Sequence, residues 1–99
     1  MVTCALVVSI TAKSGMEDEV SDFLAKAVGL ANDEAGTPVW FALRSSPQQF
    51  WIVDAFPGTA ERQAHLEGPI AAALMANASR LLSSPPEIHA ADVLASKLP

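Results

Sequence analysis

The sequence predicts an α+β fold with the element order β-α-β-β-α-β, and three observations predict it. Four short runs are rich in β-branched and aromatic residues or alternate in polarity, which is typical of strands. Two longer stretches carry apolar residues at helical spacing. With 99 residues and 51% hydrophobic content, the chain has a modest core and no room for a second domain. We therefore expect a single domain over residues 1–99.

The first strand is expected over residues 2–12, and the first helix directly after it. Both faces of the strand are largely apolar. Ser14 and Glu17 have the spacing of a capping box, which predicts the start of the helix, and Gly36 is a suitable terminator. The buried stripe of this helix is expected to consist of Val20, Phe23, Leu24, Ala27, Leu30 and Ala31.

Two further strands are predicted over residues 37–44 and 49–56, paired antiparallel. The polar stretch 45–48 between them has the composition of a hairpin loop. Alternation resumes over residues 88–97, which predicts the last strand. Right-handed crossovers then place the helical segments on one face of a four-stranded antiparallel sheet, which is the ferredoxin-like arrangement.

The second helical region is predicted to be broken into two helices. Thr59 is a plausible N-cap for a short first helix that carries His65. Gly68 fits a left-handed position just past the end of that helix, and Pro69 fits the first position of the next one. The second helix presents one stripe that includes a polar residue: Ile70, Ala73, Leu74, Asn77, Ala78 and Leu81.

Asp54, His65 and Asn77 are polar groups that can face one interior, and they form the candidate site. His65 suits a general base because its ordinary pKa is close to neutrality, although it can instead pair with Glu61 one turn earlier. Asp54 can orient His65 or be the base itself, or it can be a strand-end acid that meets solvent or a partner subunit. Asn77 can bind a substrate oxygen or satisfy a neighbouring carbonyl.

Charge and composition exclude several classes of partner. A net charge of -5 with six Lys and Arg and no basic cluster argues against nucleic acid and anionic membranes. The apolar run 4–10 is too short to span a bilayer and has no positive leader. The single Cys4 cannot form an internal disulfide and is read as a small buried hydrophobe. We expect a cytoplasmic protein.

The strands also predict a homodimer, because helices on one side leave the other face of the sheet uncovered. An interface of about 800 Å² per partner yields roughly 20 kcal/mol of gross apolar burial. That exceeds association costs of about 4–15 kcal/mol. The strand over residues 49–56 shows the two-sided apolar pattern, with Phe50, Ile52 and Phe56 on one face and Trp51, Val53 and Ala55 on the other.

Four segments in this order resemble the antibiotic biosynthesis monooxygenase family, in its cofactor-free, quinol monooxygenase-like branch of the dimeric α+β barrels. The first is Glu-Ala-Gly-Thr at 34–37, which enters a strand with an aromatic Trp40. The second is the strand ending at Phe56, with an acid at Asp54, and the third is Ala-His-Leu at 64–66. The last is the strand Asp-Val-Leu-Ala-Ser-Lys at 92–97. The resemblance spans nearly the whole chain.

The resemblance implies insertion of oxygen into a small aromatic substrate, an electron-rich phenol, quinol or anthrone, without flavin, haem or metal. A base removes a proton, the anion passes an electron to O₂, and the caged radicals combine. Such a site needs a base, an apolar cage and a group that stabilises the anion. His65 and Asp54 are then the catalytic candidates. Asn77 joins the substrate-binding candidates.

The same resemblance places Trp40 and Phe56 at the substrate. Trp40 and Phe41 point to opposite faces of their strand, so only one of them can line the pocket, and the resemblance favours Trp40. A plain core tryptophan is the alternative reading of Trp40.

Other activities fit the sequence less well. His65 and His89 are the only histidines, and no paired metal-ligand spacing or glycine-rich nucleotide loop occurs. Haem-degrading relatives carry a ligating histidine about where this chain has Met75, and an asparagine where it has Ser9. The main rival is a non-catalytic or small-molecule-binding dimer whose interior is filled by side chains. A pocket of several hundred Å³ beside His65 favours the enzyme, and a closed core favours the rival.

Overall fold

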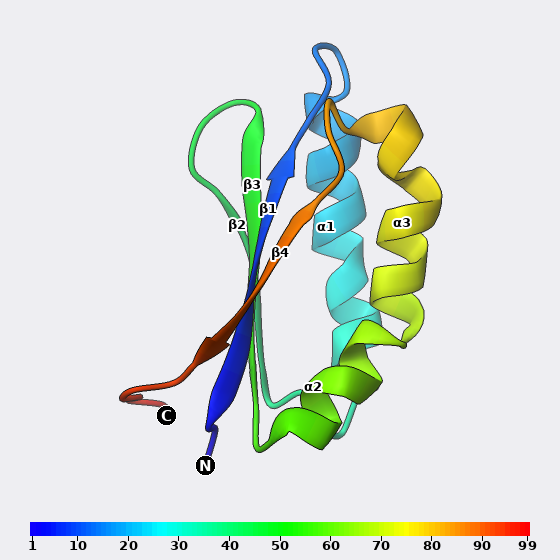
Figure 1. Cartoon of the computed structure of the whole chain (residues 1–99). Coiled ribbons are helices and arrows are strands. Elements are labelled where there is room, and N and C mark those ends of the chain that lie inside the picture. Colours follow the sequence, from blue (N-terminus) through cyan, green and yellow to red (C-terminus); the bar gives the residue numbers. More distant parts are fainter.

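A four-stranded antiparallel sheet with helices on one face forms the architecture of the computed structural model, which describes all 99 residues (Figure 1). The α+β class and the ferredoxin-like order are confirmed, with the second helical region split into two helices as predicted. The elements are β1 (Cys4–Thr11), α1 (Glu17–Asn32), β2 (Val39–Arg44), β3 (Gln49–Phe56), α2 (Thr59–Leu66), α3 (Pro69–Leu81) and β4 (Glu87–Asp92).

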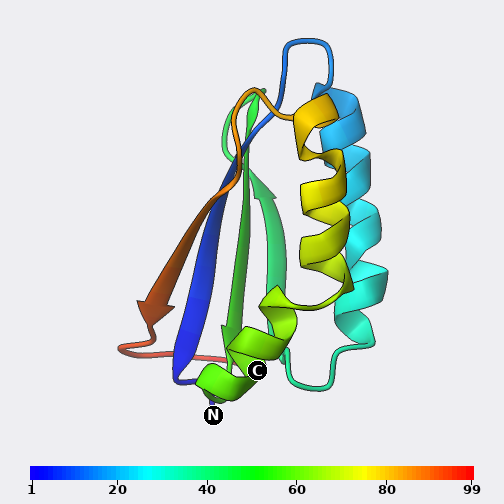
Figure 2. The same ribbon diagram turned by 45° about the vertical axis from the view of Figure 1, so that its right-hand side comes forward.

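The strand order is β2-β3-β1-β4, so the two strands with the most apolar sequence lie in the centre. Helices α1 and α3 run side by side over one face of the sheet, while α2 crosses its lower end (Figure 2). The register places Asp54 of β3 opposite Leu6 of β1 and opposite Trp40 of β2. No helix covers the other face in either view.

The core lies between the sheet and the helices and is built by the predicted alternation of β1 and β3. Leu6, Ile10 and Phe56 are among its most deeply buried side chains. Fully burying a large apolar side chain contributes about 1.5–3 kcal/mol, so this layer supplies most of the driving force for folding. From the helices, Val20 and Leu24 of α1 and Leu74 and Leu81 of α3 close it.

The capping interaction predicted for the start of α1 is wrong. No capping box forms: the N-cap is Met16, without a side-chain hydrogen bond, and Ser14 lies before the helix. The Glu17 carboxylate instead accepts a hydrogen bond from the backbone N–H of Gly15, at 2.7 Å. Gly15 has φ of +90°, a backbone conformation that side chains other than glycine rarely adopt, and this turn sets the entry into the helix.

Three other predicted ends are also corrected. Helix α1 ends at Asn32, before Gly36. Thr59 is already helical, because Gly58 is the N-cap of α2. Gly68 has φ of −90° and ψ of −176°, so it is an extended N-cap of α3 rather than a left-handed residue, with Pro69 next to it as predicted.

The last strand is shorter than predicted. Strand β4 ends at Asp92, where pairing with β1 stops at Cys4. Alternation in the sequence continues to residue 97, but beyond Asp92 only the N–H of Val93 still bonds to this part of the sheet, at the carbonyl of Thr3. None of the helices is both long enough and apolar enough to cross a membrane.

Replacing either of two glycines by alanine should change the free energy of unfolding, in opposite directions. Gly15→Ala should lower the free energy of unfolding by about 1 kcal/mol or more, because alanine is strained at positive φ. Gly29→Ala, inside α1 with open space around it, should raise that free energy by about 0.5–1 kcal/mol. Urea unfolding of both variants measures this. Shifts of the same sign would contradict the assigned turn.

Candidate functional site

His65 is buried beneath the last turn of α2, although helices usually turn a histidine outwards. Only 6% of the residue is exposed, and its ring packs against Phe56 with centroids 5.3 Å apart. The short α2 lies across the end of β3, so a side chain on its inner face points at the sheet. Its two ring nitrogens face carboxylates on different elements.

Asp54 is the inner of these carboxylates. It occupies an inward position of β3, between Ile52 and Phe56, and its exposure is 0%. Its Oδ2 lies 2.9 Å from Nε2 of His65, which is ion-pair distance. The other oxygen, Oδ1, is buried without a partner. A buried carboxylate in this state is costly unless an opposite charge compensates it, and His65 is the group in place to do so.

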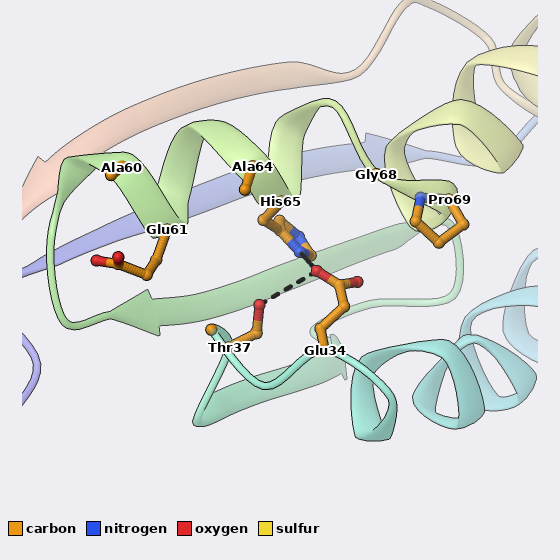
Figure 3. Close-up of a pocket in the computed structure, with 9 residues that line it drawn as sticks. Glu34, Thr37, Ala60, Glu61, Ala64, His65, Gly68 and Pro69 are labelled. Carbon is orange, nitrogen blue, oxygen red and sulfur yellow. Dashed lines mark hydrogen bonds and ion pairs between the residues drawn. The ribbon is translucent and has the colours of Figure 1, made fainter.

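Glu34 is the outer carboxylate and comes from the segment between α1 and β2. Its Oε1 lies 2.7 Å from Nδ1 of His65 and accepts a hydrogen bond from Oγ1 of Thr37 at 3.2 Å (Figure 3). The other oxygen, Oε2, is buried without a partner. In the sequence, Glu34 is only the first residue of the segment 34–37, one of those on which the family resemblance rests, and it was not predicted to be a site residue.

The charge state of His65 follows from its neighbours. Burial by itself lowers the pKa of His65, but hydrogen bonding and charge from Asp54 and Glu34 outweigh it, so its pKa is raised above the ordinary value. The imidazolium form, with both ring nitrogens protonated, matches carboxylates on both sides. With both acids ionised, the cluster of Glu34, His65 and Asp54 carries a net charge of -1.

Two hollows flank His65. The inner hollow, of about 30 Å³, is lined by Asp54 and His65 and otherwise by apolar side chains of the sheet, α2 and α3. The outer cleft, of about 340 Å³, is lined by Glu34, Glu61, Thr37 and His65, with small residues between them. By volume, the outer cleft lies within the range of ligand pockets, while the inner hollow has room for about two water molecules.

Glu61 is not the partner of His65, which settles one alternative left open by the sequence. The imidazole pairs with Glu34 and Asp54 instead, and the Glu61 side chain points away along the cleft (Figure 3). Gly68 makes room at this point. A Cβ there would lie 3.2 Å from the carbonyl oxygen of His65, a tight contact that glycine avoids.

The remaining predicted site residues are spread more widely. Phe56 contacts the imidazole, and Trp40 is partly buried beside Asp54, with its Nε1 unpartnered. Phe41 lies on the open face of the sheet, as expected. Asn77 does not share the interior with His65, which corrects that expectation: its Nδ2 donates to the carbonyl of Ala73 at 2.8 Å, and it lines neither hollow.

One comparison reveals a relative over the whole chain. The NE2512 protein of unknown function from Nitrosomonas europaea is 56% identical, and the match covers 100% of this chain and 96% of that one with a TM-score of 0.98. No family model matches this sequence, and no curated protein does.

More distant structures share the fold. A putative antibiotic biosynthesis monooxygenase from Nitrosomonas europaea has a TM-score of 0.83 at 15% identity, with 93% of this chain and 99% of that one covered. Another of that description from Deinococcus radiodurans has a TM-score of 0.83 at 13% identity, with 96% of each chain covered. The resemblance seen in the sequence is therefore confirmed at the level of the fold.

The raised pKa of His65 predicts a stability that falls with pH. The folded protein binds this proton more tightly than the unfolded chain, so the contribution is complete below about pH 6.5 and is lost as pH rises through the folded pKa. We expect the free energy of unfolding to decline as pH rises above about 6.5, measured by urea unfolding at a series of pH values.

Two variants separate this effect from other titrations. His65→Gln should remove the decline. His89→Gln should keep it, because His89 is exposed and its nearest acid, Glu87, is 3.8 Å away. An identical pH dependence in all three proteins would contradict the prediction.

Proposed function

We propose that this chain is a cofactor-free monooxygenase for a small phenol or quinol. The premise is that the chain belongs to the same family as the Nitrosomonas europaea NE2512 protein. The observation that carries the proposal is the buried cluster of Glu34, His65 and Asp54 at the wall of an apolar hollow. The neighbours described as putative antibiotic biosynthesis monooxygenases support it through their fold. The carboxylates supply a base and the hollow supplies an apolar cage, two of the components that such a reaction needs.

Asp54 is the proton acceptor in this proposal. The sequence favoured His65, but both of its ring nitrogens already face carboxylates, whereas Oδ1 of Asp54 has no partner. A substrate hydroxyl in the inner hollow donates its proton to Asp54. The cluster then becomes neutral and the negative charge passes to the substrate oxygen, so the total charge of the interior stays at -1. His65 holds the carboxylate in place and compensates its charge.

The substrate anion supplies the electrons for the oxygen chemistry. One electron passes to O₂, and the resulting superoxide and substrate radical combine to a peroxide on a ring carbon. The peroxide takes back the proton from Asp54. The ring C–H and O–O bonds then break, leaving a carbonyl and releasing water, so that a quinol and O₂ become a hydroxyquinone and water.

The size of the inner hollow restricts the substrate. At about 30 Å³, it cannot hold the three fused rings of an anthrone, and even a single ring requires side chains such as Leu74 and Ile70 to move. We therefore favour one-ring phenols and quinols. The same small volume favours a second candidate function, a small-molecule-binding or non-catalytic dimer of this fold.

Oxygen consumption tests the assignment of the base. Metal-stripped protein should take up O₂ with a panel of one-ring quinols, and Asp54→Asn should reduce turnover by about 10²- to 10⁴-fold. His65→Gln should reduce it as well, while the exposed His89→Gln should not. Binding of a quinol under argon without oxygen uptake in air would support the binding candidate instead. Full turnover in Asp54→Asn would move the base elsewhere.

We also propose that two chains associate through the open face of the sheet. Val53 lies at the centre of this face, registered against Val7 of β1 and Phe41 of β2. Phe41 is 53% exposed and Leu43 48%, so the uncovered surface is apolar and contiguous across three strands. A second copy of the same sheet is the surface that would cover it symmetrically.

A charge at the centre of this face tests the dimer. Val53→Asp should convert a dimer of twice the chain mass into a monomer in light scattering at micromolar concentration, because the charge would be buried unpaired. Met75→Asp is the matched control, since Met75 is 57% exposed on α3, on the helical side. A Val53→Asp protein that remains dimeric would contradict this interface, and a monomeric wild type would contradict the dimer.

A further inference from the structure

We propose that Glu34 is a positioning residue whose negative charge makes the Asp54–His65 pair able to accept a proton. This inference rests on the proposed function, which assigns the proton acceptor but explains neither why a carboxylate beside an imidazolium is basic nor why Glu34 is there. Glu34 acts through His65, because its Oε1 contacts Nδ1 at 2.7 Å and it does not line the inner hollow.

The role of Glu34 follows from the net charge of the cluster before and after it takes up a proton. Without Glu34, a protonated His65 and an ionised Asp54 form a neutral pair, and proton uptake would leave a net positive charge in the interior. With Glu34, the cluster begins at -1 and becomes neutral on uptake. A nearby negative charge favours the protonated form of its neighbours, so the outer carboxylate shifts the balance towards the protonated cluster.

The geometry shows that Glu34 is held for this contact. Thr37 donates a hydrogen bond to the same oxygen, Oε1, that faces the imidazole. Glu34 also fixes the ring orientation, because Nδ1 directed at Glu34 leaves Nε2 directed at Asp54.

No other charged group duplicates this effect in the surroundings of His65. Glu61, on α2 itself, lines the outer cleft without contacting the imidazole. The inner hollow receives only apolar side chains from β1, α3 and β4, and no lysine or arginine lines either hollow. Glu61 is therefore a matched control: an acid in the same cleft that lacks the contact.

Histidine titration by NMR tests the inference without any substrate. The His65 signal, identified by its absence in His65→Gln, should titrate at a lower pH in Glu34→Gln than in the wild type, and at an unchanged pH in Glu61→Gln. Thr37→Val keeps the charge of Glu34 but removes the hydrogen bond that orients its carboxylate, so His65 should titrate at an intermediate pH. The same variant provides the test if Glu34→Gln fails to fold. An unchanged His65 titration in a folded Glu34→Gln, or in Thr37→Val if Glu34→Gln is unfolded, would overturn the proposal.

Oxygen uptake provides a second test of the role of Glu34. In Glu34→Gln, kcat with a one-ring quinol should fall by about 10- to 100-fold, as for other groups that orient a reacting residue, while KM changes little because the hollow is intact. Glu61→Gln should keep the wild-type kcat. An unchanged kcat in Glu34→Gln would overturn the role in proton uptake. If the wild type consumes no oxygen, the proposed monooxygenase fails, and the NMR titration still decides whether Glu34 controls the proton on His65.

Discussion

A carboxylate in the middle of a buried strand is the constraint on which the rest of this structure depends. Asp54 occupies a position of β3 that alternation assigns to the core, where an ionised side chain without compensation is strongly unfavourable. His65 supplies the compensating charge, and Glu34 keeps that charge in place. An isolated pair of this kind is rarely a net gain in stability over apolar residues of the same size. The proposed chemistry, rather than stability, would account for such a cluster in the core.

Three segments that are far apart in the sequence meet at this cluster, and each has a local reason for its shape. Helix α2 is short because Gly68 and Pro69 end it and begin α3, and this break lets α2 lie across the end of the sheet. The segment after α1 turns back towards β2 and brings Glu34 beneath His65 (Figure 3). The register of β3 against β1 places Asp54 at the cluster. The imidazole thus joins three parts of the fold.

The sequence was sufficient to predict the order of elements, because β1 and β3 are rich in apolar, β-branched and aromatic residues and α1 carries apolar residues at helical spacing. It was less informative about caps. Ser14 and Glu17 have the spacing of a capping box, yet the turn at Gly15 diverts the Glu17 carboxylate to another N–H. Asp54 and His65 were recognised as polar groups near apolar ones. The contact between Glu34 and His65, 31 positions apart, leaves no local pattern, since any acid in a loop looks solvated until the tertiary fold is known.

The two faces of β3 divide the proposed roles of the molecule. Asp54 points to the helices and the hollow, and Val53, its neighbour in the chain, points to the open face beside Val7. Because successive side chains of a strand alternate, a register slip of one residue would place Asp54 on the open face and Val53 at the hollow. The pairing of β3 with β1 and β2 therefore maintains the site and the association surface together. Individual side chains can still change one without the other, because the sheet itself separates them.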